Sequence, residues 1–219
     1  VDPGPPAGEA SLYPSHFWTR DGISLAYRSW LPDEKPNAVV VALHGFNDYS
    51  KFFDKPANYL RERGIASYAL DQRGFGANGF RGRWFPGDRY KLDARDFTKA
   101  VAEKYPGVPL YLLGESMGGA VLMSAWAEEP LNADGLILVA PAVWGRATMP
   151  AYQTMSLWLF AHTLPWMPLT GQGIKRNPSD NIEMLRALGH DPLVIKNTRV
   201  DAVWGIVNLM DDALDYDAD

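Results

Sequence analysis

The sequence predicts an α/β domain in which a mostly parallel β-sheet is flanked by helices. Two observations carry this prediction. Short apolar runs alternate along the chain with segments of helical length, which is typical of strand–helix–strand units with right-handed crossovers. In addition, 219 residues with 47% apolar and 21% charged side chains are enough for one sizeable domain and too few for two comfortable ones.

The strands follow in order along the chain. Residues 16–19 and 23–30 are short β-rich runs separated by Arg20-Asp21-Gly22, a turn signal that predicts a hairpin. Residues 38–43 form a continuous apolar run, as expected of a strand buried on both faces. Further strands are predicted at 65–70, 111–113 and 135–140.

Three helices are expected between these strands. Residues 51–63 are amphipathic and end at Gly64, a natural C-cap. Residues 92–104 are followed by Tyr105-Pro106-Gly107, which stops a helix. The third helix is expected from residue 117 to about residue 129.

The strand at 111–113 leads into Gly114-Glu115-Ser116-Met117-Gly118, a G-x-S-x-G pattern between a strand and a helix. This is the pattern of a nucleophile elbow, in which flanking glycines let a strained turn push the serine hydroxyl out of the sheet. Ser116 is therefore the candidate catalytic nucleophile, and Gly114 and Gly118 support it. The alternative is a glycine-rich turn whose serine only caps the helix.

After Pro141 the pattern changes, because residues 149–168 are rich in large apolar side chains and are punctuated by prolines. We favour a cap or lid that presents these side chains to an acyl chain over a small satellite core. Helices at 180–188 and 198–214 would complete the cap. The apolar side chains concerned are Trp158, Leu159, Phe160, Leu164, Trp166 and Met167.

These segments predict three regions. Residues 1–10, with three prolines and two glycines, form a flexible N-terminal arm. Residues 11–145 form the α/β core, and residues 146–219 form the helical cap or lid.

Composition excludes several classes of function. The net charge of −5 argues against a nucleic-acid surface, and the lack of cysteine excludes disulfides and cysteine-based metal sites. The sequence has no run of 18 uncharged apolar residues, so we expect no transmembrane segment. The compartment is unknown: a soluble cytoplasmic protein and one exported after removal of a signal peptide both fit.

Three motifs in this order resemble a known superfamily: His44-Gly45-Phe46, residues 71–76 (Asp-Gln-Arg-Gly-Phe-Gly) and residues 114–119 (Gly-Glu-Ser-Met-Gly-Gly). Together they resemble the α/β-hydrolases, and within them the monoacylglycerol lipase/lysophospholipase-like (serine aminopeptidase S33-type) hydrolases. The resemblance covers nearly the whole chain and implies the α/β-hydrolase fold with a helical cap.

The resemblance implies a serine hydrolase that cleaves carboxylic esters through an acyl-enzyme on Ser116. A monoacylglycerol or lysophospholipid is the expected small-molecule ester substrate, although a short-chain esterase, thioesterase or amidase would use the same parts. It places the oxyanion hole at the N–H groups of Phe46 and Met117, with His44 and Gly45 supporting that loop. No metal or organic cofactor is implied.

Two neighbouring charged residues are expected to have structural roles. Arg73 would brace its loop through an ion pair with an acid such as Asp71, although a substrate contact is the alternative. Glu115 is expected to point away from the nucleophile as a packed or solvated carboxylate.

The acid and the base that the resemblance implies have no matching position, because the superfamily order is Ser, then Asp or Glu, then His. His44 precedes Ser116, and His162 and His190 lie in the predicted cap. We favour a chain that lacks the C-terminal strands of the fold, with a second chain as one source of the missing part. The alternatives are His162 or His190 as a substitute base, and a non-catalytic protein that binds a lipid or small molecule.

Overall fold

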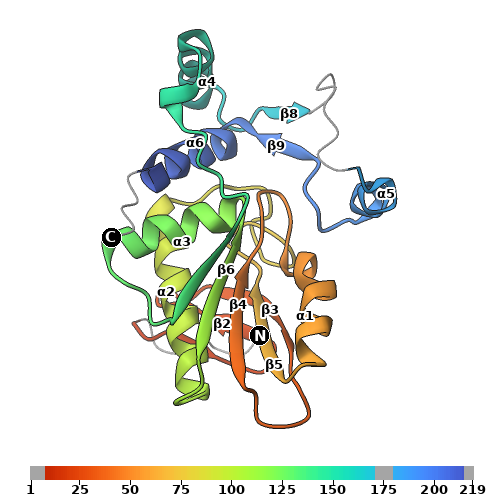
Figure 1. The fold of residues 1–219 in the computed structure, drawn as a ribbon. Coiled ribbons are helices and arrows are strands. Elements are labelled where there is room, and N and C mark those ends of the chain that lie inside the picture. Colours follow the sequence, from red (N-terminus) through yellow and green to blue (C-terminus); the bar gives the residue numbers. More distant parts are fainter. Residues whose placement is uncertain (1–7, 171–179, 215–219) are drawn as a thin grey trace.

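The computed structural model describes residues 8–170 and 180–214, and its centre is a seven-stranded sheet (Figure 1). The strand order is β1-β2-β3-β5-β4-β6-β7, with the first three strands and the β3–β5 pair antiparallel and the rest parallel. This mixed, mostly parallel sheet flanked by helices confirms the predicted fold class. The strands are β1 (Ser11–Leu12), β2 (His16–Trp18), β3 (Ser24–Trp30), β4 (Ala38–Leu43), β5 (Ile65–Leu70), β6 (Leu110–Glu115) and β7 (Gly135–Val139).

Strand β4 is buried on both faces, as its continuous apolar run predicts. Val39, Val41 and Leu43 belong to the main core, which packs against α2 (Gly87–Lys104) and α3 (Met117–Glu128). Val40 and Ala42 belong to a second cluster beneath α1 (Asp54–Arg61) on the opposite face. Because successive side chains of a strand point to opposite faces, the apolar run supplies both layers at once.

Two helix starts differ from the prediction. The segment 51–63 divides into a 3-10 turn at Ser50–Phe53 and α1 at Asp54–Arg61. Pro56 explains the division, since a proline ring clashes with the carbonyl four residues earlier and fits only the first turn of an α-helix. Helix α2 begins at Gly87, directly after Pro86, rather than at residue 92. Its first turn is polar, so the apolar periodicity does not reveal it.

After Pro141, the described residues form a short 3-10 turn at Arg146–Thr148, three α-helices and one β-ribbon that was not predicted. The helices and strands are α4 (Ala151–Thr163), β8 (Pro168–Thr170), α5 (Ile182–His190), β9 (Asn197–Arg199) and α6 (Val200–Leu214). Strands β8 and β9 pair antiparallel, and β9 takes the start of the segment predicted as the helix 198–214.

Helix α6 differs from α4 in where it packs. Its Ile206, Leu209 and Ala213 are part of the main core, and Figure 1 shows α6 lying along α3. Its apolar face is therefore buried against the α/β layers, and its part in the cap predicted at residues 146–219 stays a prediction. The boundary at residue 145 stays a prediction. The predicted arm lies mostly at residues 1–7, outside the described residues.

Helix α4 buries none of its residues, and its large apolar side chains face solvent. Met155 is 72% exposed, Trp158 52% and Leu159 50%. A satellite core would have buried these side chains, so that alternative is wrong for α4. No helix in the described part of the chain is both long enough and apolar enough to cross a membrane.

Candidate active site

Ser116 lies in the sharp turn between β6 and α3 with φ 48° and ψ −111°. A positive φ is uncommon for a residue with a side chain and persists only where the surroundings hold it. Here the Ser116 N–H donates to Val139 O at 3.0 Å, and Ser116 O accepts from Ala142 N at 2.9 Å. The end of β7 and the segment after it therefore fix the turn, and Ser116 itself is only half-buried.

The glycines of the elbow sit where a side chain has no room. A Cβ on Gly118 would lie 2.3 Å from Leu43 O, and one on Gly114 would lie 2.6 Å from Gly119 Cα. A Cβ on Gly45 would lie 3.4 Å from Ser116 Cβ, so the loop after β4 runs directly beside the serine. The predicted supporting residues Gly45, Gly114 and Gly118 are thus brought together around Ser116.

His44 is fully buried, and its ring holds the loop rather than facing Ser116. Its Nδ1 donates to Gly45 O at 2.7 Å and its Nε2 accepts the Gln72 N–H at 2.9 Å. Its backbone O accepts from Gly118 N at 3.1 Å and from Gln72 Nε2 at 2.8 Å. With both ring nitrogens engaged by backbone groups, His44 ties together the ends of β4, β5 and β6 and is in no position to act as a base.

This arrangement predicts how stability depends on pH. Burial lowers the pKa of His44 below its ordinary value, against smaller opposing effects of its bond to Gly45 and of Asp71 and Asp48. Below about pH 6.5 the unfolded chain therefore binds more protons at this residue, so the free energy of unfolding falls as pH falls. His44→Asn keeps an N–H donor for Gly45 O and removes the titration. We expect the free energy of unfolding, measured with urea, to fall less between pH 7.5 and pH 5 in His44→Asn than in the parental protein. The difference should be up to about 1.4 kcal/mol per pH unit. Equal losses would contradict this role.

Two backbone N–H groups flank the serine without an acceptor among the residues that the structure describes: those of Phe46 and Met117. Met117 is the first residue of α3, so its N–H also carries the partial positive charge of the helix N-terminus. Phe46 is held by its ring, whose centroid lies 5.8 Å from that of Phe75 and 6.1 Å from that of Trp84. Both groups are suited to receive a developing oxyanion.

The side chain of Glu115 is half-buried beside the same loop. Its Oε2 lies 3.9 Å from where a Cβ on Gly45 would stand. Burial, and secondarily the charge of Asp48, raises the pKa of Glu115, and burial likewise raises that of Asp48. Glu115 is therefore a packed carboxylate.

Neither candidate histidine of the cap is hydrogen-bonded to Ser116. His162 Nδ1 lies 2.7 Å from Trp158 O, and His190 Nδ1 lies 2.7 Å from Arg186 O, each within its own helix. Of the acidic C-terminal stretch, Asp211 pairs with Arg146, while residues 215–219 lie outside the described residues. No general base or triad acid is assigned among residues 8–170 and 180–214.

Comparison with known proteins identifies the family. The family profile described as serine aminopeptidase, S33 matches residues 34–219, which is most of the chain and includes every candidate site residue. The chain belongs to this family.

Curated relatives of this S33 chain include lipases. It is 32% identical over 131 residues to monoglyceride lipase of Rattus norvegicus, covering 58% of this chain and 43% of the relative. It is 28% identical over 184 residues to monoacylglycerol lipase of Mycolicibacterium smegmatis, covering 79% of this chain and 62% of the relative. The chain thus spans about two fifths to three fifths of the length of these relatives.

Solved structures share the fold. A monoglyceride lipase of Saccharomyces cerevisiae in complex with a substrate analogue superposes with a TM-score of 0.73 at 21% identity, over 96% of this chain and 70% of that one. A lipase in an open form gives a TM-score of 0.74 at 17% identity, over 90% of this chain and 72% of that one. This S33 chain therefore has the α/β-hydrolase fold.

Arg73 forms the ion pair expected of it, but with different acids. Its guanidinium bonds to Asp93 and Asp21, with Nη2 at 2.7 Å from Asp93 Oδ1 and 2.6 Å from Asp21 Oδ1. Asp71 instead accepts the N–H groups of Ser50 at 2.8 Å and Ala77 at 2.9 Å. The partner was missed because Asp93 lies on α2 and Asp21 in the first hairpin, both distant in sequence. Arg73 is buried in this network, which leaves it no room to contact substrate.

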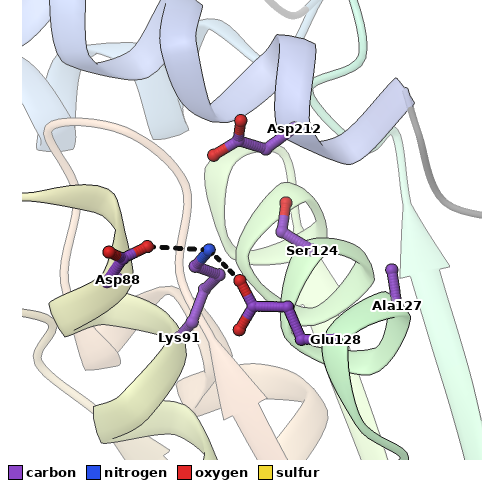
Figure 2. A pocket seen from close by; sticks show the side chains of 6 residues that line it. All are labelled: Asp88, Lys91, Ser124, Ala127, Glu128 and Asp212. Atoms are coloured by element: carbon purple, nitrogen blue, oxygen red, sulfur yellow. Dashed lines mark hydrogen bonds and ion pairs between the residues drawn. The ribbon is translucent and has the colours of Figure 1, made fainter.

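A separate pocket of about 350 Å³ lies between α2, α3 and α6 and contains none of the candidate site residues (Figure 2). Lys91 Nζ lies between two carboxylates of the pocket lining and bonds to Asp88 at 2.9 Å and to Glu128 (Figure 2). Three of the pocket's four charged residues, Asp88, Lys91 and Glu128, are therefore paired with one another. It is lined by Asp88, Lys91, Ser124, Ala127, Glu128 and Asp212.

Proposed function

We propose that this protein is a serine hydrolase that cleaves carboxylic esters of lipid type, such as monoacylglycerols or lysophospholipids, through an acyl-enzyme on Ser116. The observation that carries the proposal is the backbone of Ser116, held at φ 48° between β6 and α3 with the free N–H of Met117 next to it. A residue that only capped the helix would need no such strain, and Ser116 makes no side-chain cap bond to α3. The lipase relatives support the ester class.

The chemistry follows from these positions. Ser116 Oγ attacks the acyl carbon while its proton passes to a general base, which we do not assign to any described residue. The carbonyl oxygen becomes an oxyanion bound by the N–H groups of Phe46 and Met117. The alcohol leaves with a proton, and water then attacks the acyl-enzyme, releasing the fatty acid and restoring Ser116.

Helix α4 supports an acyl chain as part of the substrate. Met155 and Leu159 lie one helical turn apart and so share a face, with 72% and 50% of their surfaces exposed. Covering these side chains with an alkyl chain would remove apolar surface from water, at about 0.8 kcal/mol per buried methylene. The substrate should therefore be bound more tightly as its acyl chain lengthens.

Hydrolysis of p-nitrophenyl esters from acetate to palmitate tests this class of substrate. We expect kcat/KM to rise from acetate to medium or long chains. The double variant Met155→Ser/Leu159→Ser should lower kcat/KM for the long-chain ester about tenfold and leave the acetate ester unchanged. Tyr59→Ala is the matched control, since Tyr59 is 57% exposed on α1, which packs on the face of the sheet opposite α2 and α3.

Two results would contradict the proposal in different ways. Preference for acetate, or equal losses on acetate and palmitate in the double variant, would remove the acyl-chain role of α4. Binding of fatty acid by the full-length protein without hydrolysis of any ester in the series would instead indicate a non-catalytic lipid-binding protein.

A further inference from the structure

The residue after Phe46 has an unusual backbone. Asn47 has φ 67°, and it is one of four non-glycine residues with positive φ in the described chain, Ser116 being another. Asparagine tolerates this conformation better than most residues, but it still needs contacts to hold it. Within the loop after β4 itself, the Asp48 N–H donates to Gly45 O at 3.2 Å.

The contacts that hold Asn47 come from the segment between α5 and α6. Asn47 O accepts the Ile195 N–H at 2.9 Å, and Asn47 Nδ2 donates to Thr198 Oγ1 at 2.7 Å. These two bonds, made by Asn47, Ile195 and Thr198, are called the latch below. Ile195 precedes β9 and Thr198 lies in it, and Figure 1 shows β9 above the ends of β4 and β6.

A second anchor lies beside the latch. Asp191 Oδ2 accepts from Tyr49 Oη at 2.8 Å and from Lys51 Nζ at 3.1 Å. Asp191 Oδ1 in turn accepts the Leu193 N–H at 2.9 Å, which orients the carboxylate. Residues 47–51 are therefore bound to residues 191–198 at both ends.

We propose that the latch positions the Phe46 N–H, so that β9 sets how well the protein binds an oxyanion at Ser116. This inference rests on the proposed hydrolase function. An oxyanion donor is effective only when it is aimed before the reaction, because a mobile donor must be reoriented in the transition state. The carbonyl of the same peptide unit, Gly45 O, is already held by His44 Nδ1 at 2.7 Å and by the Asp48 N–H at 3.2 Å. The fixed conformation of Asn47 restrains the chain on the other side of Phe46, so that the whole loop keeps one position.

The latch also links the Phe46 N–H to helix α4, whose apolar side chains are exposed. Strand β9 pairs with β8, where Thr198 lies opposite Leu169, and Val200 N–H donates to Met167 O at 3.0 Å. Residues 167–170 follow α4 closely in the chain. Thr198 is thus a positioning residue between the surface that would bind the acyl chain and the group that would bind the oxyanion.

Thr198→Val tests the latch, because valine keeps the shape of threonine and removes the hydroxyl that accepts from Asn47. For p-nitrophenyl butyrate we expect kcat to fall about tenfold with KM changed by less than about twofold. The reason is that the displaced Phe46 N–H would have bonded the oxyanion, which forms only in the transition state. An alkyl trifluoromethyl ketone would react with Ser116 Oγ to form a hemiketal whose oxygen lies in the oxyanion hole. The affinity of the protein for this ketone should fall by a similar factor. Thr198→Ser, which keeps the hydroxyl, should restore both quantities.

Two further variants complete the design. Asn47→Gly keeps the positive φ and loses the amide, so it should match Thr198→Val, and the double variant should be no worse than either single one. If Thr198→Val does not fold, Asn47→Gly alone still tests the latch. Thr148→Val is the control, since the Thr148 hydroxyl bonds Gly145 O at 2.9 Å and touches neither the latch nor Ser116.

The latch is contradicted if Thr198→Val keeps the parental kcat, if the loss lies in KM with ketone affinity unchanged, or if Thr198→Ser is no better than Thr198→Val. The parental protein and Ser116→Ala separate this failure from that of the proposed function. If the parental protein hydrolyses esters through Ser116, only the latch fails. If it does not, both proposals fall.

Discussion

Ser116→Ala is expected to abolish ester hydrolysis, lowering kcat about 10⁴- to 10⁶-fold. The reason is that the acyl-enzyme forms on its Oγ, while the oxyanion donors Phe46 and Met117 alone retain only a small part of the catalysis. The fold should remain, since Ser116 makes no side-chain cap to α3. Steady-state kinetics with a p-nitrophenyl ester and a thermal unfolding midpoint measure both quantities on the same preparation.

Two companion variants sharpen this test. Ser124→Ala, on the same helix, removes a buried hydroxyl that has no recorded hydrogen-bond partner, so activity and stability should both stay near the parental values. Ser116→Gly should be inactive but about 1 kcal/mol more stable than Ser116→Ala, because glycine relieves the strain at φ 48°. Activity of Ser116→Ala within about tenfold of the parental protein would contradict the assignment of the nucleophile.

Gly118→Ala is expected to have the largest effect on stability. The new Cβ would lie 2.3 Å from Leu43 O and 2.6 Å from Leu43 C, and these are backbone atoms of β4 that cannot swing aside. Helix α3 would have to move off the sheet, which would also break the Gly118 N–H bond to His44 O. We expect a loss of about 3 kcal/mol or more in the free energy of unfolding, together with loss of hydrolysis.

Urea unfolding measures the effect, and Gly79→Ala is the matched control. Gly79 is exposed, and a Cβ there would meet no atom within 4 Å. The control should therefore stay within about 0.5 kcal/mol of the parental protein. A parental unfolding midpoint for Gly118→Ala would mean that the elbow is not packed against β4 as described.

Much of the core was predictable because its signals are local. The apolar run at β4 predicts a strand buried on both faces, and the glycines around Ser116 predict a tight turn with no room for side chains. Each pattern spans only a few residues, and the structure shows both features. The helix predicted to end at residue 63 ends at Arg61, and Gly64, with φ 75°, lies in the turn that follows it.

What was missed depends on contacts between distant parts of the chain. Arg73 could have paired with any nearby acid, and only the packing of α2 on the sheet selects Asp93. The ribbon of β8 and β9 has three residues in each strand, too few for an alternating pattern to be recognised. Asn47 and Thr198 are 151 residues apart in the sequence, so no local sequence pattern predicts the hydrogen bond between them.

Covalent labelling tests the central claim most directly. A fluorophosphonate probe phosphonylates a serine only when its hydroxyl is activated, so we incubate the full-length protein with the probe and map the adduct by peptide mass spectrometry. The account predicts one adduct, on Ser116, that is absent in Ser116→Ala and present in Ser124→Ala. An unlabelled protein, or an adduct on another serine that persists in Ser116→Ala, would contradict it.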